Sequence, residues 1–471
     1  MISKSLALKV LNASLETGGD YAELYIEQTD SENINLENGK VESFGSKRSY
    51  GAGIRIMQGL RYVYGYTSDL SAKSLLGLAV KLSASFSGER AITVSEIKKG
   101  KYKVINKIAA GDHLYEIPVE KKVAYLKECF EITKSVDPRL VRIQDNFLTT
   151  HRVFELYTAE GATATKFVNE EERGRLSIVA MALGENNDVQ TAFNGPGACH
   201  GWSYFTKTLN YKERAKFAGE KAIGLLTAKD CPSGKYPVVI ANGWGGVLFH
   251  EACGHPLEAS ATAKGLSVFS NSIGKPIASP IVSAWDDGTI PNEWGSNNID
   301  SEGVPTHKNE LIRDGICVGF MVDRFNGRRL GMAPNGTSRR ESYRYAPTSR
   351  MSNTYIAPGK DDPADIIKDT KLGIYVANFG GGSVDPSTGQ FNFSASEAYI
   401  IREGKICEMV KGCTLIGTGQ EVLLNIDRVG NDLDLGQGNC GAGSGSVPVN
   451  VGQPTIRLKE ITVGGSGGKL E

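Results

Sequence analysis

The sequence lacks three features that mark whole classes of protein. It has no run of 18 apolar residues, so no segment is expected to cross a membrane as a helix. Its 53 basic residues cancel its 53 acidic residues, which gives no argument for nucleic acid or an anionic membrane as a partner. Residues 1–17 are interrupted by Lys4, Lys9 and Asn12, so they contain no continuous apolar core of a secretion signal.

Cysteine is sparse and glycine is abundant. The eight cysteines are scattered along 471 residues without the close spacing of a disulfide framework. In the absence of an export signal, reduced thiols are expected, and we predict a cytoplasmic protein. The 56 glycines indicate many turns, as in a β-rich protein, and the length is sufficient for two domains with separate cores.

Residues 1–228 show the pattern of an α+β domain with a mixed sheet and flanking helices. Asn38-Gly39 lies between alternating segments and is typical of a type I′ hairpin turn. The order of helix, strands and helix occurs twice, which predicts two diverged α-β-β-β-α units that share one sheet. The predicted helices cover residues 1–17, 71–85, 118–135 and 208–228, and predicted strands include 21–28, 34–43, 52–57, 60–66, 140–146, 152–158, 162–168, 175–183 and 189–193.

Residues 229–471 are predicted to form a second, mostly antiparallel β domain that begins near Cys231-Pro-Ser-Gly234.

Two stretches rich in basic residues have both a functional and a structural interpretation. The lysine-rich residues 88–112 are predicted to be a solvated connector rather than a basic binding arm. The arginine-rich residues 324–350 predict a long irregular segment, which either binds phosphate or forms a solvated or carboxylate-holding loop.

The clearest chemical motif is His250-Glu251-Ala-Cys-Gly-His255, which follows a hydrophobic strand at Tyr236–Ala241. Two imidazoles and an adjacent carboxylate are what a hydrolytic zinc site needs, as ligands and as a base for a water molecule at the metal. The alternative is that these side chains are satisfied polar groups of a buried helix. Because the chain has only six histidines, two of them in this window favour the metal site.

The two histidines are five residues apart, which is unusual for a shared metal. On a regular helix over Gly245–Ala263 they would lie roughly 140° apart around the axis. A single π-type turn, which closes residue i to residue i+5, would return them to one face. Gly254 is permissive and Pro256 has no N–H for the carbonyl of Ala252. We therefore predict a bulged or broken helix at Ala252 to Pro256.

A catalytic zinc site uses three protein ligands and one open position, so a third ligand is missing from the motif. Cys253 lies between the histidines and would face the wrong way on the helix. Cys440 lies in a glycine-rich segment, Gln437–Gly445, which can approach a metal closely. That segment is also compatible with a plain flexible loop and, much more weakly, with a phosphate cradle. The spacing leaves all the candidates open: Cys440, Cys413, Cys407, Cys253, His307 and Glu258.

Two further features have a functional and a structural interpretation. Glu258 follows His255 by three residues, where it either holds an imidazole or is an ordinary helix carboxylate. Gly380, Gly381 and Gly382 let another backbone approach, so an exposed edge there would accept an extended peptide as an added strand. The alternative is a β-bulge with structural glycines.

Taken together, these and other segments resemble the TldD/PmbA family, often called modulators of DNA gyrase. The resemblance covers essentially the whole length and is to the TldD side, because PmbA-type members lack the complete metal motif. It rests on residues 250–258, 380–389, 396–399, 411–417, 429–432, 439–441 and 451–455.

The resemblance implies a zinc-dependent peptidase, with one zinc per chain bound by His250, His255 and Cys440 and with Glu251 as the general base. It also implies a site inside a dimer, either a homodimer or a heterodimer with a PmbA-type paralogue, that accepts unfolded or extended peptides. One alternative is a non-catalytic peptide-binding or regulatory module with a structural metal site, against which the retained Glu251 argues. Another is iron or manganese, although a Cys/His₂ ligand set suits zinc.

Overall fold

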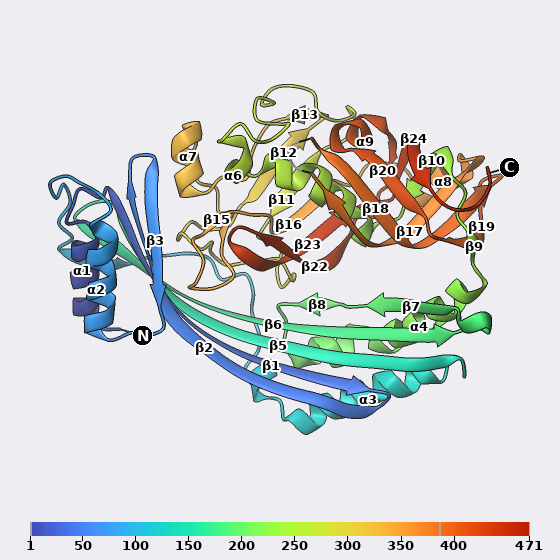
Figure 1. Ribbon diagram of the computed structural model, residues 1–471, viewed down its shortest axis with the longest axis horizontal. Coiled ribbons are helices and arrows are strands. Elements are labelled where there is room, and N and C mark those ends of the chain that lie inside the picture. Colours follow the sequence, from blue (N-terminus) through green and yellow to red (C-terminus); the bar gives the residue numbers. More distant parts are fainter. Residues whose placement is uncertain (1, 386–387, 471) are drawn as a thin grey trace.

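In the computed structural model, which describes residues 2–385 and 388–470, long strands form a curved sheet in the N-terminal half. The strand order is β3-β2-β1-β5-β6-β4, and all of these neighbours are antiparallel except β4 and β6. Figure 1 shows the C-terminal half along the concave side of this sheet. The strands are β1 (Tyr21–Glu37), β2 (Lys40–Gln58), β3 (Arg61–Thr67), β4 (Glu96–Lys99), β5 (Leu140–Ala159) and β6 (Thr163–Leu183), with β7 (Val189–Asn194) and β8 (Gly197–Ala198) paired to β6.

The prediction of several short strands is wrong where one long strand runs through. Polar residues such as Asp30 and Ser31 suggest a break in β1, yet each is paired on both sides, with β2 and with β5. The ladder hydrogen bonds hold these residues in the strand whatever their hydropathy. The Asn38-Gly39 turn is confirmed, because both residues have the positive φ that a type I′ turn needs, +49° and +76°.

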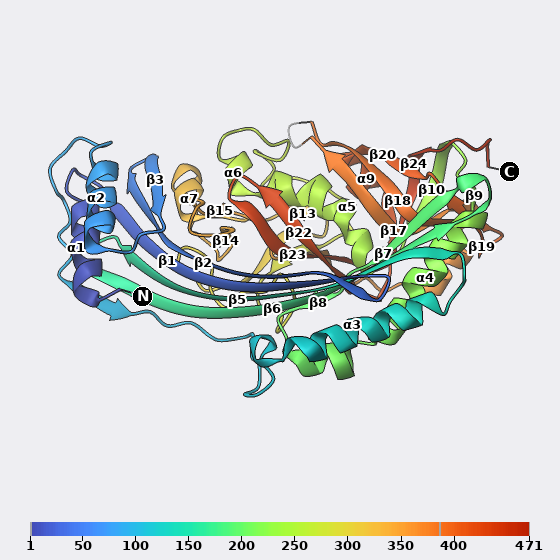
Figure 2. The same ribbon diagram turned by 60° about the horizontal axis from the view of Figure 1, so that its bottom comes forward.

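Helices cover the two ends of the curved sheet. Helices α1 (Lys4–Ser14) and α2 (Ala72–Ser83) lie together at one end, and α3 (Val119–Lys134) and α4 (Tyr211–Thr227) lie at the other (Figures 1 and 2). The element order is α1-β1-β2-β3-α2 followed by α3-β5-β6-β7-α4, and β1 and β5 are neighbours at the centre of the sheet. None of the helices in the described residues combines the length and the apolar character of a membrane-crossing segment.

Strand β1 separates an apolar face from a charged one. Ala22, Leu24 and Ile26 pack into the cluster beneath α1 and α2. The alternate residues Glu23 and Tyr25 are also buried, but they contact side chains of the C-terminal half. Since successive strand residues point to opposite faces, the buried segment from Tyr21 to Glu27 contributes side chains to both layers.

The C-terminal half contains a closed ring of strands and a second sheet. The ring runs β17-β10-β24-β20-β18 and closes because β18 also pairs with β17. The second sheet runs β13-β12-β11-β16-β23-β22. The ring strands are β10 (Gly234–Ile240), β17 (Leu372–Val384), β18 (Gln390–Arg402), β20 (Thr414–Thr418) and β24 (Ile456–Gly464); the second sheet holds β11 (Ala284–Asp287), β12 (Lys308–Arg313), β13 (Ile316–Cys317), β16 (Asn353–Ile356), β22 (Asp434–Ala442) and β23 (Gly445–Gln453).

Most pairings of the C-terminal half are antiparallel, as expected, and the exceptions are β10 with β17, β16 with β23 and β9 with β19. Short elements border the two sheets and complete the α+β architecture. They are β9 (Lys229–Asp230), β14 (Ser338–Arg339), β15 (Thr348–Ser349), β19 (Lys405–Lys411), β21 (Ile426–Val429), α7 (Arg324–Leu330), α8 (Pro363–Lys368) and α9 (Gly419–Asn425).

The arginine-rich segment joins the two halves through buried ion pairs. Arg340 lies 2.5 Å from Glu23, and Arg55 lies 2.6 Å from Glu23 and 2.5 Å from Glu302. All of these side chains are at most 1% exposed, so removing one partner would leave an uncompensated charge at a cost of about 3–5 kcal/mol. The carboxylate-holding interpretation is therefore correct for Arg340.

The lysine-rich connector is solvated as predicted, because its lysines are exposed.

A buried carboxyl group under helix α3 predicts an unusual pH dependence of stability. Asp145 on β5 is 1% exposed, and neither of its side-chain oxygens has a hydrogen-bond partner in the described residues. Burial raises the pKa of this carboxyl to about 8. The folded chain therefore keeps a proton that the unfolded chain loses near pH 4. The resulting loss of unfolding free energy with rising pH is at most about 1.4 kcal/mol per unit between about pH 4 and pH 8.

Asp145→Asn should remove this contribution, and the exposed Asp230→Asn should leave it intact. Urea unfolding of both variants and of the native chain at pH 6 and pH 8 measures the difference. The same pH dependence in Asp145→Asn as in the native chain would contradict the assignment.

Candidate metal centre

The His250-Glu251-His255 motif lies in a π turn rather than in a regular helix. The turn covers His250–Gly254, and the amide of His255 donates its hydrogen bond to the carbonyl of His250. This is the i to i+5 closure that the spacing predicts. The prediction of a bulged helix is confirmed, but its position differs from Ala252 to Pro256. The π turn begins two residues earlier, at His250, and a 3₁₀ turn at His255–Leu257 follows it.

The helix expected over Gly245–Ala263 is broken, as predicted, but by more than a single bulge. The segment is a 3₁₀ turn at Gly243–Gly246, one turn of helix α5 (Val247–Phe249), the π turn, the second 3₁₀ turn and helix α6 (Ala259–Thr262). Glu258 separates the last two, because its ψ of 133° is extended. Its backbone pairs with Met321 instead of continuing the helix.

Close backbone contacts explain the glycines on both sides of the turn. A Cβ on Gly246 would lie 2.4 Å from backbone atoms of Gly452 in β23. A Cβ on Gly419, at the start of α9, would lie 2.2 Å from the carbonyl oxygen of Ala252. The π turn therefore packs closely against α9, and the 3₁₀ turn before it packs closely against β23, and only glycine leaves room at either contact.

His250, His255 and Cys440 converge on one point. The Cys440 Sγ lies 3.3 Å from His250 Nε2 and 3.1 Å from His255 Nε2, and the three donor atoms lie within 4.8 Å of one another. The imidazole planes are nearly perpendicular, at 83°, with ring centroids 5.2 Å apart. In the described residues this is the group of His, Cys, Asp and Glu side chains that could hold a metal ion.

Cys440 reaches the histidines from a β-hairpin, which corrects the expectation of a glycine-rich loop. It lies on β22 and pairs with Val447 on β23. The glycines of the segment serve packing, because Cβ atoms on Gly436 and Gly438 would lie within 2.9 Å of the Trp244 side chain. The structure gives no support for a phosphate cradle here, since Gln437–Ala442 is regular strand.

The other candidates for a third ligand lie elsewhere. Cys253 and Cys413 are buried in the apolar core, whereas Cys407 and His307 are exposed. None of these four belongs to the donor group found in the described residues.

The electrostatics of the cluster favour a thiolate at Cys440 and a protonated imidazole at His255. Burial opposes ionisation of Cys440, but hydrogen bonds from His250 and His255 outweigh it and lower the pKa of the thiol to about 4. Burial also opposes the charging of His255, yet the Glu258 carboxylate and the Cys440 sulfur raise its pKa well above the usual value. The thiolate is the form in which cysteine binds metals.

Glu258 lies where an imidazole-orienting carboxylate is expected. Its Oε1 is 3.3 Å from His255 Nδ1 and 3.9 Å from Arg350 Nε. Sequence reasoning missed Arg350, which is fully buried and donates from Nη2 to the carbonyl oxygen of Cys440. One side chain thus touches both the Cys440 strand and the carboxylate behind His255. Its membership of a basic segment was the only signal in the sequence.

Glu251 differs from its neighbours because it reaches solvent. Its side chain is 29% exposed, whereas His250 is 2% exposed. Its Oε2 lies 3.8 Å from His255 Nε2. A carboxylate thus stands at the accessible rim of the cluster, next to the atoms on which the donors converge.

The glycine segment Gly380–Gly382 lies on the exposed part of β17. It pairs with β18 on one side, with a register shift between Phe379 and Gly381 as the β-bulge alternative expects, whereas β10 pairs only with Ile374–Val376 further along the strand. Trp244 connects this part to the site: its Nε1 donates to the carbonyl of Phe379 at 3.0 Å, and its ring packs against β22. Two residues of the resembling segment 380–389, at positions 386 and 387, lie outside the described residues.

The donor set fits a divalent metal ion such as zinc. Imidazole nitrogen at about 2.0–2.1 Å and thiolate sulfur at about 2.3 Å in a tetrahedron place nitrogen and sulfur roughly 3.5 Å apart. The measured 3.3 and 3.1 Å are close to this value. Three protein donors with an accessible carboxylate beside them define the class of metal-dependent hydrolases.

Comparison with known proteins specifies the family within that class. The family model of the PmbA/TldA metallopeptidase C-terminal domain matches residues 233–465, and those of domain 1 and the central domain match residues 22–85 and 112–226. The chain is 36% identical over 480 residues to a metalloprotease TldD homolog of Haemophilus influenzae, covering 99% of this chain and 97% of the relative. It is 30% identical over 453 residues to a metalloprotease of Methanothermobacter thermautotrophicus, covering 96% and 97%. The chain belongs to the PmbA/TldD metallopeptidase family.

Solved structures share the fold. TldE from Thermococcus kodakarensis superposes with a TM-score of 0.74 at 18% identity, covering 94% of this chain and 97% of TldE. A Thermotoga maritima protein described as a modulator of a DNA gyrase gives 0.77 at 20% identity, covering 94% and 96%.

Gly419→Ala tests whether close packing holds the π turn. Alanine is the better helix former by about 1 kcal/mol, so any loss of stability must come from its Cβ against Ala252. We expect Gly419→Ala to lower Tm, through overpacking of about 1–3 kcal/mol. Gly77→Ala in helix α2 is the matched control, because its Cβ would meet nothing within 4 Å. It should raise Tm, and a rise in both variants would contradict the packing argument.

Proposed function

We propose that this protein is a zinc-dependent peptidase that cleaves extended or unfolded peptides, with Glu251 as the general base. One observation carries the proposal: the Glu251 carboxylate stands at the accessible rim of a buried His250–His255–Cys440 donor group. A purely structural metal site has no use for such a carboxylate, because structural sites are closed by four protein ligands.

His250, His255 and Cys440 would hold the metal. A zinc ion bound there supplies Lewis acidity that polarises a peptide carbonyl and lowers the pKa of water. Glu251 accepts a proton from the attacking water and returns it to the leaving amine. Glu258 keeps His255 oriented through Nδ1. A thiolate ligand leaves less positive charge on the metal than a third imidazole, so Glu251 carries more of the catalysis.

The identity of the metal follows from the chemistry of the donors. One thiolate and two imidazoles form a soft to borderline set that suits zinc better than manganese or iron. Family members are named metalloproteases, and a Saccharolobus solfataricus relative, 31% identical over 248 residues, is named a zinc metalloprotease TldD homolog.

Peptide binding at the β17 edge is the second part of the proposal. Gly380, Gly381 and Gly382 are exposed, and a Cβ on Gly381 would meet nothing within 4 Å. A peptide backbone can therefore approach this edge and add as a strand, which selects extended main chain more than side chains. Trp244 lies between this edge and β22, so a peptide bound here lies near the donor group.

We further propose that the working form is a dimer with the site inside it, formed with a second copy or with a PmbA-type paralogue. The fold shared with TldE supports the second arrangement, since a paralogue of like fold can supply a matching surface. We place this peptidase in the cytoplasm, and the proposal needs no contact with membrane or nucleic acid.

Glu251→Gln should abolish peptide hydrolysis while the protein keeps its metal. Loss of a general base lowers kcat by about 100-fold or more. The measurement is cleavage of an unstructured fluorogenic peptide, together with metal content, before and after chelation and zinc addition. Glu460→Gln, which changes an exposed glutamate of the same half, is the matched control and should retain full activity.

If Glu251→Gln retained the native rate, the assignment of the base would be wrong. If no unstructured peptide were cleaved by the zinc-loaded native protein, alone or with a paralogue, the regulatory alternative would replace the peptidase.

A further inference from the structure

We propose that a cavity between the N-terminal sheet and the Cys440 hairpin binds a small monovalent anion of the chloride class, held by the guanidinium groups of Arg339 and Arg152. The cavity has a volume of about 30 Å³ and is lined by β5 and β6, by residues 297–301, by residues 339–341 and by the first residues of β23, 446–448. Its lining contains none of the three metal-site donors.

Arg339 is a buried cation without a carboxylate partner. It is 5% exposed, and Nη1 donates to the carbonyl of Met351 at 2.6 Å. Among the described residues no carboxylate oxygen lies within 4 Å of it. Burial and the neighbouring charges of Arg173 and Arg350 lower the pKa of Arg339 to about 9. An unpaired buried guanidinium is costly, and an anion beside it would remove that cost.

The lining holds the guanidinium groups of Arg152, Arg339 and Arg340 and the carboxyl groups of Glu171, Asp300 and Glu341, and the members other than Arg339 have partners of their own. Arg152 and Arg173 share one carboxylate, Glu171, at 2.5 and 2.8 Å. Besides Glu171, the carboxylate that favours the charged form of Arg339 is Asp286. Asp286 already accepts hydrogen bonds from Ser352 and Thr354. Arg340 pairs with Glu23, the Glu341 carboxylate accepts from the Ser446 amide, and burial raises the pKa of Asp300 to about 8, so none of these groups forms an ion pair with Arg339.

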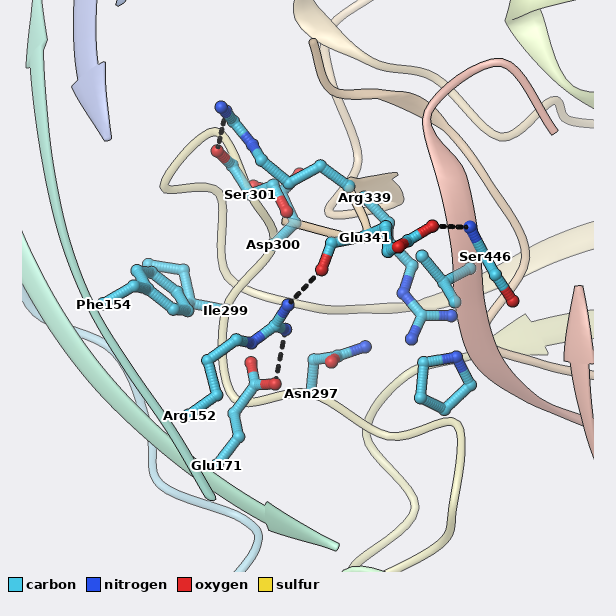
Figure 3. A pocket seen from close by; sticks show the side chains of 13 residues that line it. Arg152, Phe154, Glu171, Asn297, Ile299, Asp300, Ser301, Arg339, Glu341 and Ser446 are labelled. Carbon is cyan, nitrogen blue, oxygen red and sulfur yellow. Dashed lines mark hydrogen bonds and ion pairs between the residues drawn. The ribbon is translucent and has the colours of Figure 1, made fainter. Parts of the chain in front are cut away.

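The size and donors of the cavity select the ligand. A space of about 30 Å³ holds one or two water molecules or one small ion, but no phosphate ester or organic acid. Figure 3 shows Arg152 and Asn297 on one side of the space and Glu341 and Ser446 at its other side. Arg152 Nη1 contacts the Glu341 carbonyl, and the Glu341 side chain accepts from the Ser446 amide at 2.7 Å.

These contacts connect the anion to the hairpin that carries Cys440. The Glu341 amide donates to the Ser444 carbonyl at 2.9 Å, so the backbone and the side chain of Glu341 both bind the hairpin, at Ser444 and at Ser446. Arg350 joins the same turn through the Ser444 hydroxyl and the Gly445 carbonyl. An anion between Arg339 and Arg152 therefore stabilises the turn from the side of the N-terminal sheet, independently of whether the metal site is catalytic.

The test compares sodium chloride with sodium gluconate at equal ionic strength, because gluconate is too large for the cavity. We expect a saturable rise of Tm by about 2 °C or more in chloride only. Arg339→Gln should remove the difference between the salts, and Arg339→Lys should restore part of it. Arg428→Gln is the matched control, because Arg428 is paired with Asp361 and Asp369 away from the cavity. It should respond to chloride as the native chain does.

Glu341→Gln removes a negative charge from the cavity lining. It should lower the chloride concentration at which the rise of Tm is half-maximal. Crystals of the full chain soaked in sodium bromide give a direct readout, with an anomalous peak expected beside the Arg339 guanidinium. The proposal is overturned if the salts give equal Tm values, if Arg339→Gln keeps the chloride response, or if bromide is found only at the metal site or on the surface.

Discussion

The hydrogen bond from the His255 amide to the His250 carbonyl is the constraint on which the site depends. It closes a π turn and thereby turns two side chains that a regular helix would separate toward one point. Gly419 allows α9 to approach this turn closely, and Gly246 allows β23 to approach the 3₁₀ turn that precedes it. Cys440 then completes the group from the same hairpin as β23, so one packing arrangement positions the turn and the third donor together.

A second layer of charged groups fixes this arrangement. Arg350 donates to the Cys440 carbonyl and stands beside Glu258, which lies 3.3 Å from His255 Nδ1. Arg340 belongs to the same segment and pairs with Glu23 on the N-terminal sheet. The curved sheet is therefore a support for the metal centre, and its buried charges resist separation of the two halves because each would be left unpaired.

Local chemistry made part of the site predictable. The i to i+5 spacing, with Gly254 and Pro256, was enough to predict a bulge, because helix geometry alone forbids a shared ligand face. The Asn38-Gly39 hairpin was predictable for the same reason, since few residues tolerate its φ values. By contrast, the long strands were not, because continuous pairing on both sides overrides the polar residues near Asp30. Arg350 and the hairpin geometry of Cys440 depend on contacts between residues 90 or more positions apart, which composition and periodicity do not reveal.

The metal content of three purified proteins decides whether His250, His255 and Cys440 bind a metal ion. Purified native protein, Cys440→Ala and Cys407→Ala would be dialysed in zinc-containing and then zinc-free buffer and examined by elemental analysis. Cys407 is the matched control, because it is exposed on β19 and lies outside the donor group. We expect one zinc ion per chain in the native protein and in Cys407→Ala, and a large loss of zinc in Cys440→Ala. Equal zinc in all three proteins would contradict this expectation.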